Sequence, residues 1–251
     1  MNIQSLNTPN TNIYPQYKPN FCANPFKAGR TAMEKRINSS PFDVAEKIYD
    51  DLWEELKLPK DLKLQFALRP YEDGSTMSFE LENLCIGIDK NISKLKMHLM
   101  NVTGITKAFL RHEIDHVQKY WIVIRYHGAD GIIKRLPEKE RKSIIDFNKF
   151  KNYLINVQKH FGEIKPEETE DAIKYTKAFD NYKSAFVEID PFNTSTLDII
   201  IKMIKAHKNY EHNAIEIEAD KAQKEYMPTK IEFIKAILKE TWNILRNKKS
   251  N

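Results

Sequence analysis

An amphipathic pattern with the period of an α-helix runs from Leu110 to Tyr126. At about 100° per residue, one side carries an apolar stripe made of Leu110, Ile114, Val117 and Trp121. The other side carries His112, His116 and Val123, with Glu113 and Tyr120 beside them. Thr103 is a suitable N-cap and Gly128 a suitable stop. The pattern predicts a helix that buries one face and turns the other toward a cleft.

Further helical patterns lie on both sides of this segment. A helix over about 41–57 can begin with Ser40 as its cap and Asp43 in a capping-box position. Its expected buried face consists of Val44, Ile48, Leu52 and Leu56. Pro137 opens a helix that should run to about Phe161 and stop at Gly162. Its expected core contacts are Ile144, Phe147, Leu154, Val157 and Phe161.

The C-terminal half is also predicted to be helical. A short helix follows Pro166 to about Tyr182, and a long helical segment covers about 195–226 before Pro228. The last helix, over about 230–247, starts with Thr229 and Glu232 as a capping box.

Strand patterns occur only between the first helix and the histidine-bearing helix. Three runs alternate apolar and polar residues: Leu62, Leu64, Phe66 and Leu68; Met77, Phe79 and Leu81; and Leu84, Ile86 and Ile88. Asp73 and Gly74 suit a tight turn between the first two runs. We therefore expect a small antiparallel sheet, whose exposed edge near 84–88 could pair with an extended peptide.

The chain divides into a leader and one body. Residues 1–39 contain most of the Asn and Pro bias and show no helical or strand period, which is typical of a disordered or loosely attached segment. Residues 40–251 show no further domain boundary. The predicted fold class of this body is α+β and mostly helical.

Composition narrows the function classes. The 40 basic and 35 acidic residues give a net charge of +5 that is spread along the chain, so we expect no nucleic-acid partner. Cys22 and Cys85 lack metal-ligand spacing. No apolar run approaches the length of about 20 residues that a membrane span needs, and no signal peptide is recognisable. These features favour a soluble, cytoplasmic protein, with non-standard export left open.

The main candidate for chemistry is the sequence His112-Glu113-Ile114-Asp115-His116, which has the pattern H-E-x-x-H. Two imidazoles four residues apart lie nearly above one another on a helix, within reach of one metal ion. Glu113 can then face a water molecule held by that metal. The alternative is a pair of solvated histidines on a charged helix.

A catalytic zinc site needs a third protein ligand. Glu216 and Asp220 are i,i+4 on a predicted helix, so one carboxylate could bind the metal while the other accepts the spare N–H of a ligand imidazole. Glu218 is the rival ligand, and its side chain would point about 200° away from that of Glu216. We favour Glu216 because it pairs with Asp220.

These residues resemble the gluzincin class of zinc metallopeptidases, in which H-E-x-x-H is followed downstream by E-x-x-x-D. The local form is similar to the CAAX-processing and HtpX-like peptidases and to the ImmA/IrrE-like group. The resemblance covers about 30 residues, and it implies a zincin-like domain that binds Zn²⁺. It implies His112, His116 and Glu216 as ligands, Glu113 as general base and Asp220 as the partner of a ligand histidine. The transmembrane helices of the CAAX-processing type are absent.

Other polar side chains are candidates for supporting roles. His212 could be an extra ligand or a substrate contact, and His207 or Tyr210 could donate a hydrogen bond to the oxyanion. Tyr120 and Tyr226 are further oxyanion candidates.

The leading hypothesis is zinc-dependent hydrolysis of a peptide or protein substrate, with a zinc-bound water as nucleophile and Glu113 as base. The alternative is a zinc-binding regulatory or interaction protein of the same fold that does not cut, with His212 closing the fourth position. A weaker alternative is a basic helical protein that binds nucleic acid.

Overall fold

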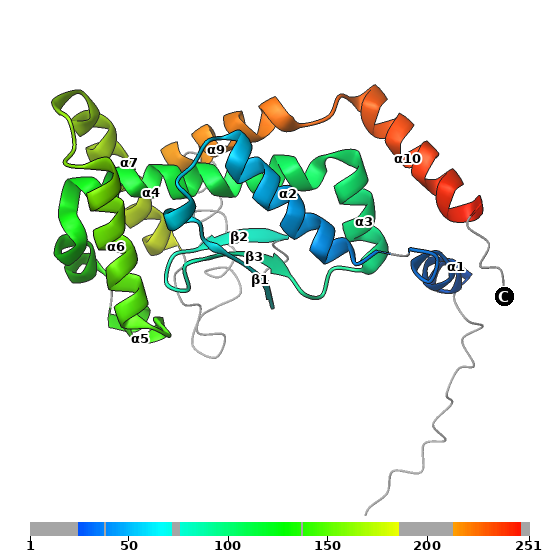
Figure 1. Cartoon of the computed structure of the whole chain (residues 1–251), viewed down its shortest axis with the longest axis horizontal. Helices are drawn as coiled ribbons and strands as arrows, with labels where there is room; N and C mark the ends of the chain where they lie inside the picture. Colours follow the sequence, from blue (N-terminus) through cyan, green and yellow to red (C-terminus); the bar gives the residue numbers. More distant parts are fainter. Residues whose placement is uncertain (1–24, 38, 72–75, 137, 186–212, 247–251) are drawn as a thin grey trace, which may run out of the picture.

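The computed structural model describes residues 25–37, 39–71, 76–136, 138–185 and 213–246 (Figure 1). The helices are α1 (Pro25–Glu34), α2 (Pro41–Glu55), α3 (Lys94–Thr103), α4 (Ile105–Arg135), α5 (Glu138–Ser143), α6 (Phe147–Phe161), α7 (Thr169–Ala185), α9 (Ala214–Tyr226) and α10 (Lys230–Arg246). The strands are β1 (Gln65–Arg69), β2 (Met77–Glu80) and β3 (Cys85–Asp89), and two 3-10 turns are η1 (Lys60–Leu62) and η2 (Pro166–Glu168). The fold is therefore α+β and mostly helical, as predicted. No described helix combines the length and the apolar character that crossing a membrane requires.

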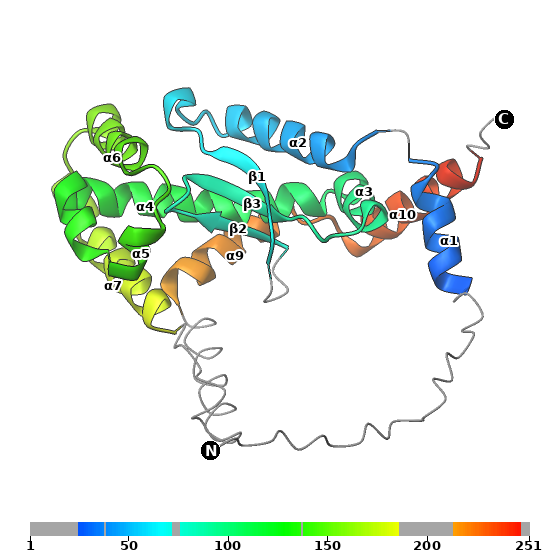
Figure 2. The ribbon, with the colours of Figure 1, turned by 90° about the horizontal axis from the view of Figure 1, so that it is seen from below.

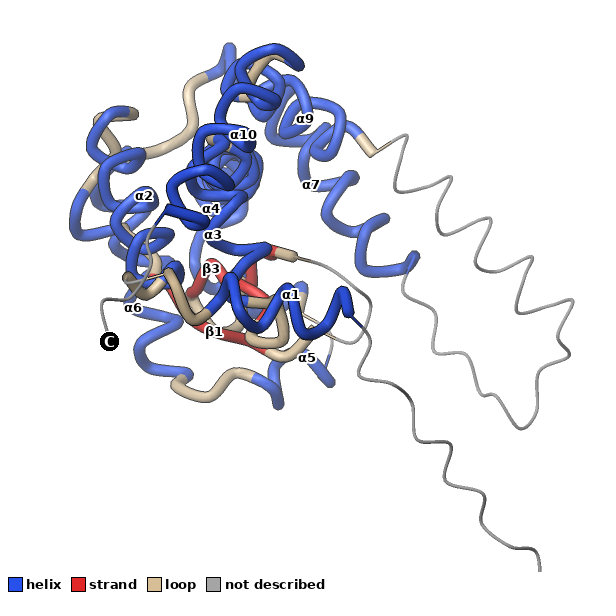
Figure 3. Tube along the Cα trace, turned by 90° about the vertical axis from the view of Figure 1, so that its right-hand side faces the viewer, coloured by secondary structure: helices blue, strands red, loops and turns tan. Residues whose placement is uncertain are grey.

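Helix α4 is the centre of the fold. Figure 3 looks along α4, with the strands on one side of it and α9 on the other, and α2, α3, α6 and α7 also contact it. The predicted apolar stripe of α4 is buried. The opposite side, which we expected to face a cleft, is buried as well, because α9 packs along it. Every residue from His112 to Val117 is consequently buried.

The sheet differs from the predicted antiparallel one. Its strand order is β1-β3-β2, with β3 parallel to β1 and antiparallel to β2. The segment near 84–88 is thus the central strand, and the prediction that it offers a free edge is wrong. The edge strand that contacts α4 is β2, which Figure 2 shows from the sheet side. Alternation predicts which residues share a face of a strand, but it does not identify the neighbouring strand.

The side chain of Tyr71 passes over the central strand β3 and connects the two edge strands. The Tyr71 hydroxyl, just after β1, donates a hydrogen bond to Glu80 Oε1 at the end of β2, at 2.8 Å. Tyr71 passes over Gly87 of β3, where an added Cβ would lie 1.9 Å from the tyrosine oxygen. The glycine in the central strand therefore leaves room for a side chain that links the two edge strands.

The start of α4 and its interruption at Gly128 test two predicted helix boundaries. Thr103 does not cap α4: it is the last residue of α3, and its hydroxyl donates to the Leu99 carbonyl oxygen at 2.7 Å. Gly104, with φ of 85°, ends α3 and starts α4. Gly128, with φ of 71° and ψ of 165°, is not helical, so the first helical stretch of α4 stops there as predicted. A second helical stretch follows this kink and continues to Arg135.

Other boundaries confirm or refine the predictions. Ser40 caps α2 and Leu52 is buried, both as predicted. The other buried residues of α2 are Pro41, Ala45, Tyr49 and Trp53, because the rings of Tyr49 and Trp53 turn toward the core. The helix predicted from Pro137 is two helices, with Asp146 capping the second, and it ends at Gly162 as predicted. Of its predicted core contacts, Phe147 and Phe161 are exposed.

The segment before residue 40 contains structure that we did not predict. Helix α1 lies within the predicted leader, and the residues after it are attached to the body. Lys94 Nζ donates to the Ile37 carbonyl oxygen at 2.8 Å, and Arg36 Nη1 donates to the Leu245 carbonyl oxygen at 3.4 Å. The predicted helical segment over 195–226 is described only as α9, since 186–212 lie outside the described residues.

Candidate metal centre

The H-E-x-x-H pattern lies in the middle of α4. The helical spacing brings the two imidazoles together, and His112 Nε2 lies 3.0 Å from His116 Nε2. Both residues are less than a tenth exposed. The two ring nitrogens therefore face one point from a buried helix, as the i,i+4 spacing predicts.

The third side chain comes from the first turn of α9. Asn213 caps this helix and donates through Nδ2 to the Ala178 carbonyl oxygen of α7 at 2.8 Å, which fixes where α9 begins. Glu216 then lies with Oε2 3.3 Å from His112 Nε2 and Oε1 3.5 Å from His116 Nε2. The predicted set of His112, His116 and Glu216 is thus brought together, although one hundred residues separate the last two.

The three side chains are close enough to share one metal ion. The two imidazole nitrogens are 3.0 Å apart, and they lie 3.3 and 3.5 Å from two different oxygens of the Glu216 carboxylate. One donor atom from each residue lies within 4.8 Å of the other two. Two imidazoles and one carboxylate also match the donors that zinc and related transition metals prefer, whereas Ca²⁺ and Mg²⁺ prefer oxygen ligands. The group can therefore hold a metal ion.

Asp220 lies where the sequence predicted a partner for a ligand histidine. Its Oδ1 is 3.4 Å from His112 Nδ1, on the side of the ring opposite the converging nitrogens. A carboxylate in that place orients the imidazole and raises its basicity. His112 Nδ1 and His116 Nδ1 are both buried and have no hydrogen-bond partner among the described residues. Asp220 is therefore a nearby charge for His112 in this structure, and it does not contact His116 in the same way.

The two histidines differ in their protonation. Burial lowers the pKa of His116 to about 4, so its imidazole is neutral at neutral pH. Burial also disfavours charge on His112, but the hydrogen bond with Glu216 and the charges of Glu113, Glu216 and Asp220 outweigh it and raise its pKa. The carboxylates around His112 thus attract positive charge to this point, whether it is a proton or a cation.

Glu113 contacts the sheet. The backbone N–H of Phe79 in β2 donates to Glu113 Oε2 at 2.8 Å. Burial raises the pKa of Glu113 to about 7, although the charge of His112 and the Phe79 hydrogen bond oppose this rise. A carboxyl group with a pKa near neutrality can accept and return a proton in one reaction cycle. Sequence reasoning did not predict the Phe79 contact, because no local pattern relates β2 to α4.

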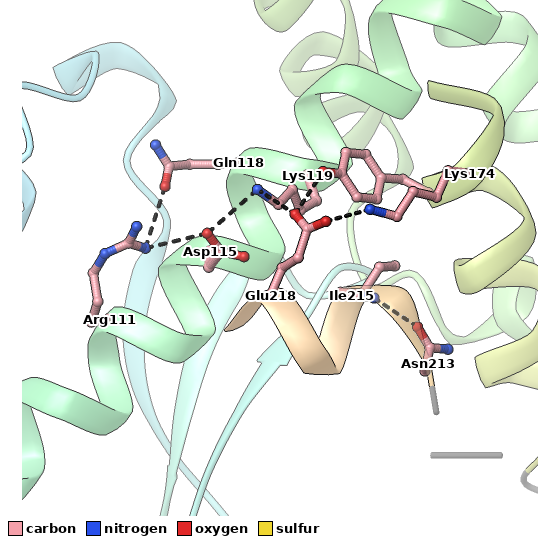
Figure 4. A network of polar contacts seen from close by, with 9 residues as sticks. Arg111, Asp115, Gln118, Lys119, Lys174, Asn213, Ile215 and Glu218 are labelled. Carbon is pink, nitrogen blue, oxygen red and sulfur yellow. Dashed lines mark hydrogen bonds and ion pairs between the residues drawn. The ribbon is translucent and has the colours of Figure 1, made fainter. Parts of the chain in front are cut away.

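Glu218, the rival third ligand, points away from the histidines, as the helical geometry predicted. Figure 4 shows its carboxylate among cationic and phenolic groups of α4 and α7. Tyr175 donates its hydroxyl to Glu218 Oε2 at 2.7 Å, Lys119 Nζ lies 3.1 Å from the same oxygen, and Lys174 also bonds to the carboxylate. Burial would raise the pKa of Glu218, but these three groups outweigh it and hold the pKa at about 2.

Asp115 joins this polar network from α4, and sequence reasoning missed its role. It is buried, and its Oδ1 lies 3.6 Å from Arg111 Nη1 and 3.7 Å from Lys119 Nζ. The signal was present, because Arg111, Asp115 and Lys119 follow one another at i,i+4 spacing. Asp115 and Glu218 share Lys119, so one lysine links α4 to α9 on the side away from the histidines.

The remaining candidates have different outcomes. Tyr226 donates its hydroxyl to Glu55 of α2 at 3.1 Å. Tyr120 is buried and packs edge-on against Phe79 and Phe179, with ring centroids 6.2 and 4.9 Å apart. His207, Tyr210 and His212 lie outside the described residues.

Comparisons of the chain with protein-family models, with curated proteins and with solved structures found no match.

Proposed function

We propose that the protein is a zinc metalloendopeptidase of zincin-like architecture, with His112, His116 and Glu216 as the metal ligands and Glu113 as the general base. The observation that carries this proposal is the convergence of the two imidazoles of α4 with the carboxylate of α9. One donor atom from each of the three residues lies within 4.8 Å of the other two, which is close enough for them to bind one zinc ion. Three protein ligands leave a fourth position for water, as catalytic zinc sites do.

Glu113 is the residue that moves protons in this mechanism. Zinc, when bound, lowers the pKa of a bound water toward about 7 and polarises the scissile carbonyl. Glu113 accepts a proton from the attacking water as the oxygen bonds to the carbonyl carbon. It then donates that proton to the amine nitrogen as the carbon–nitrogen bond breaks. Burial raises the pKa of Glu113 in the metal-free site, which makes its carboxylate a stronger base.

The protein environment favours this role for Glu113. The Phe79 N–H holds one carboxylate oxygen at 2.8 Å and leaves the other oxygen for the water. Burial excludes bulk solvent from the carboxyl group, which strengthens electrostatic interactions there.

We place the substrate along β2. This edge strand contacts α4, and its Phe79 N–H points away from β3 toward Glu113. An extended peptide that pairs with a sheet edge gains backbone hydrogen bonds and presents its carbonyl groups in order. The substrate would therefore be an unfolded segment or a peptide rather than a compact domain.

The metal-binding part of the proposal is tested by zinc content and affinity. We expect the purified chain to hold one zinc ion, the His116→Ala variant to lose it, and the Glu216→Ala variant to bind zinc much more weakly than wild type. His160→Ala is the matched control, because His160 lies on the surface, 41% exposed in its side chain. Equal zinc content in all four proteins would remove the proposed ligand set.

The catalytic part is tested with Glu113→Gln, which keeps the size of the side chain and removes its basicity. We expect this variant to bind zinc normally and to lose hydrolysis of a mixture of unfolded peptides by at least about a hundredfold. Undiminished hydrolysis would exclude Glu113 as the base. Zinc binding by the wild-type chain with no hydrolysis of any peptide would instead favour a zinc-binding regulatory protein.

A further inference from the structure

Helix α10 presents an apolar face to solvent. The largest exposed apolar side chains of this helix are Ile231, Ile234, Leu238, Trp242 and Leu245, each between 49% and 65% exposed. At 100° per residue, these five side chains fall within an arc of roughly 80°. We call this set the α10 stripe. It is contiguous, unlike the exposed Ile145, which lies between α5 and α6, and the exposed Ile173 of α7.

The opposite face of α10 packs on α3. Phe233 and Ile237 line a pocket together with Leu99 and Met100 of α3. Glu240 Oε1 of α10 lies 2.7 Å from His98 Nε2 of α3. Figure 1 shows α10 at the outside of the molecule, beyond α3 and away from the sheet. Helix α10 therefore packs on α3 through one face, and the α10 stripe is a second apolar face that stays exposed.

Basic side chains border the stripe. Lys235, Lys239 and Arg246 fall within the next roughly 60° of the helix circumference, and all three are exposed. We call them the basic edge. Lys230 lies beyond the other border of the stripe and is exposed as well. Arg246 also lies over the Trp242 ring, with its guanidinium carbon 4.7 Å from the ring centroid.

Acidic side chains near the stripe are few and engaged. Glu232 accepts from the backbone N–H and the hydroxyl of Thr229 at the start of the helix, and Glu240 pairs with His98 on the inner face. The sequence continues past α10 with Lys248 and Lys249. The border of the stripe is thus positively charged along most of its length.

We propose that α10 docks on the surface of a membrane that contains anionic lipids, with the α10 stripe at the level of the acyl chains and the basic edge at the phosphate groups. An amphipathic helix with an apolar face that contains Trp and with basic flanks lies in the plane of such an interface. The inner face stays on α3, so docking requires no opening of the fold. This surface is independent of the proposed metal centre.

The charge of the border decides between this partner and a second copy of the chain. If two copies paired through the α10 stripe, the basic edges would lie near one another without compensating carboxylates, which disfavours the pair. Anionic headgroups instead compensate Lys235, Lys239 and Arg246. The charge complementarity therefore favours the lipid surface.

The test is co-flotation of the full chain with vesicles at low salt. We expect binding to an equal mixture of phosphatidylcholine and phosphatidylserine that is at least about tenfold tighter than binding to phosphatidylcholine alone. Added salt should weaken the binding. Ile234→Glu should reduce binding to the mixed vesicles by at least about tenfold. The matched control is Ile145→Glu, which makes the same change between α5 and α6 at a residue that is 81% exposed. This variant should bind the vesicles as wild type does.

A second pair of variants separates local charge from net charge. Lys235→Glu with Lys239→Glu should abolish the preference for anionic vesicles. Lys47→Glu with Lys177→Glu changes the net charge equally at exposed positions of α2 and α7 and should retain the preference. All these positions are exposed, so circular dichroism should show unchanged folding.

Two outcomes overturn the proposal. One is absence of flotation with mixed vesicles, or equal binding by the α10 variants and their controls. The other is a dimer in analytical ultracentrifugation that Ile234→Glu dissociates, without vesicle binding by the wild-type chain.

Discussion

The backbone N–H of Phe79 donates a hydrogen bond to Glu113 Oε2 at 2.8 Å, and this contact connects the edge strand β2 to the central helix α4. It ties the strand that we propose for substrate binding to the carboxylate that we propose for proton transfer. A hydrogen bond to a charged group contributes about 1.5–3 kcal/mol, so its loss should affect catalysis measurably.

Phe79→Pro removes this N–H, and a proline is tolerated on an edge strand. We expect kcat/KM for peptide hydrolysis to fall by about ten- to a hundredfold, with the zinc Kd unchanged. The control is Phe79→Ala, which removes the ring and keeps the N–H. An equal loss in both variants would show that the aromatic ring, rather than the hydrogen bond, supports the site.

Zinc should stabilise the folded chain, because the ligands converge only when α4 and α9 are packed together. At a free zinc concentration of one hundred times Kd, the expected gain is about 2.7 kcal/mol. The measurement is the Tm with zinc and with a chelator. His116→Ala should lose the difference, whereas His160→Ala should keep it. A zinc-dependent Tm that persists in His116→Ala would place the metal elsewhere.

Glu218 should affect the metal through Glu216. It fixes α9 against α4 and α7 through Lys119, Lys174 and Tyr175 (Figure 4), and this fixes the rotation of the helix that carries Glu216. We expect Glu218→Ala to weaken the zinc Kd by about tenfold.

A double-mutant cycle tests whether Glu218 acts only through the third ligand. In a Glu216→Ala background, Glu218→Ala should then have no further effect on zinc affinity. Glu225→Ala, at an exposed position of the same helix, is the control for a general change in α9. Additive effects of the two substitutions would indicate that Glu218 acts on the fold alone.

The stability should depend on pH through Glu168. Arg125 of α4 donates from Nη1 and Nη2 to the two oxygens of Glu168, each at 2.8 Å. These hydrogen bonds, together with the Lys165 backbone N–H, lower the pKa of Glu168 below its ordinary value of 4.5. The folded pKa is depressed, so the stabilisation is present above about pH 4.5 and is lost as the pH falls through the folded pKa.

Glu168→Gln isolates this contribution. We expect the variant to be about 1 kcal/mol less stable than wild type at pH 7, and the difference should vanish in acid below the folded pKa. Urea unfolding at both pH values measures it. A constant difference would assign the effect to packing. Glu167→Gln, on the same turn, is the control.

Local features of the fold followed from the sequence because their causes are local. Ser40 accepts from the Asp43 N–H, and Thr229 forms the predicted reciprocal bonds with Glu232. Such caps depend only on residues three apart. The same holds for Gly162, which ends α6.

Non-local features could not be predicted in the same way. The order of the strands depends on which surfaces meet when the chain collapses, and the alternating pattern is the same for an edge strand and a central one. The ion pair between Lys119 and Glu218 and the hydrogen bond between Phe79 and Glu113 are non-local in the same sense, because each joins two elements that are distant in the sequence.

By itself, the sequence determined that His112 and His116 share a helix face and that Glu216, rather than Glu218, turns to the side of Asp220. Helical periodicity is sufficient for both conclusions. Only the tertiary structure decided that these two faces meet, since α4 and α9 pack against each other and are linked by the network around Lys119. The spacing of residues along a helix determines which way each side chain points. Whether two distant helices contact each other depends instead on how the whole core is buried.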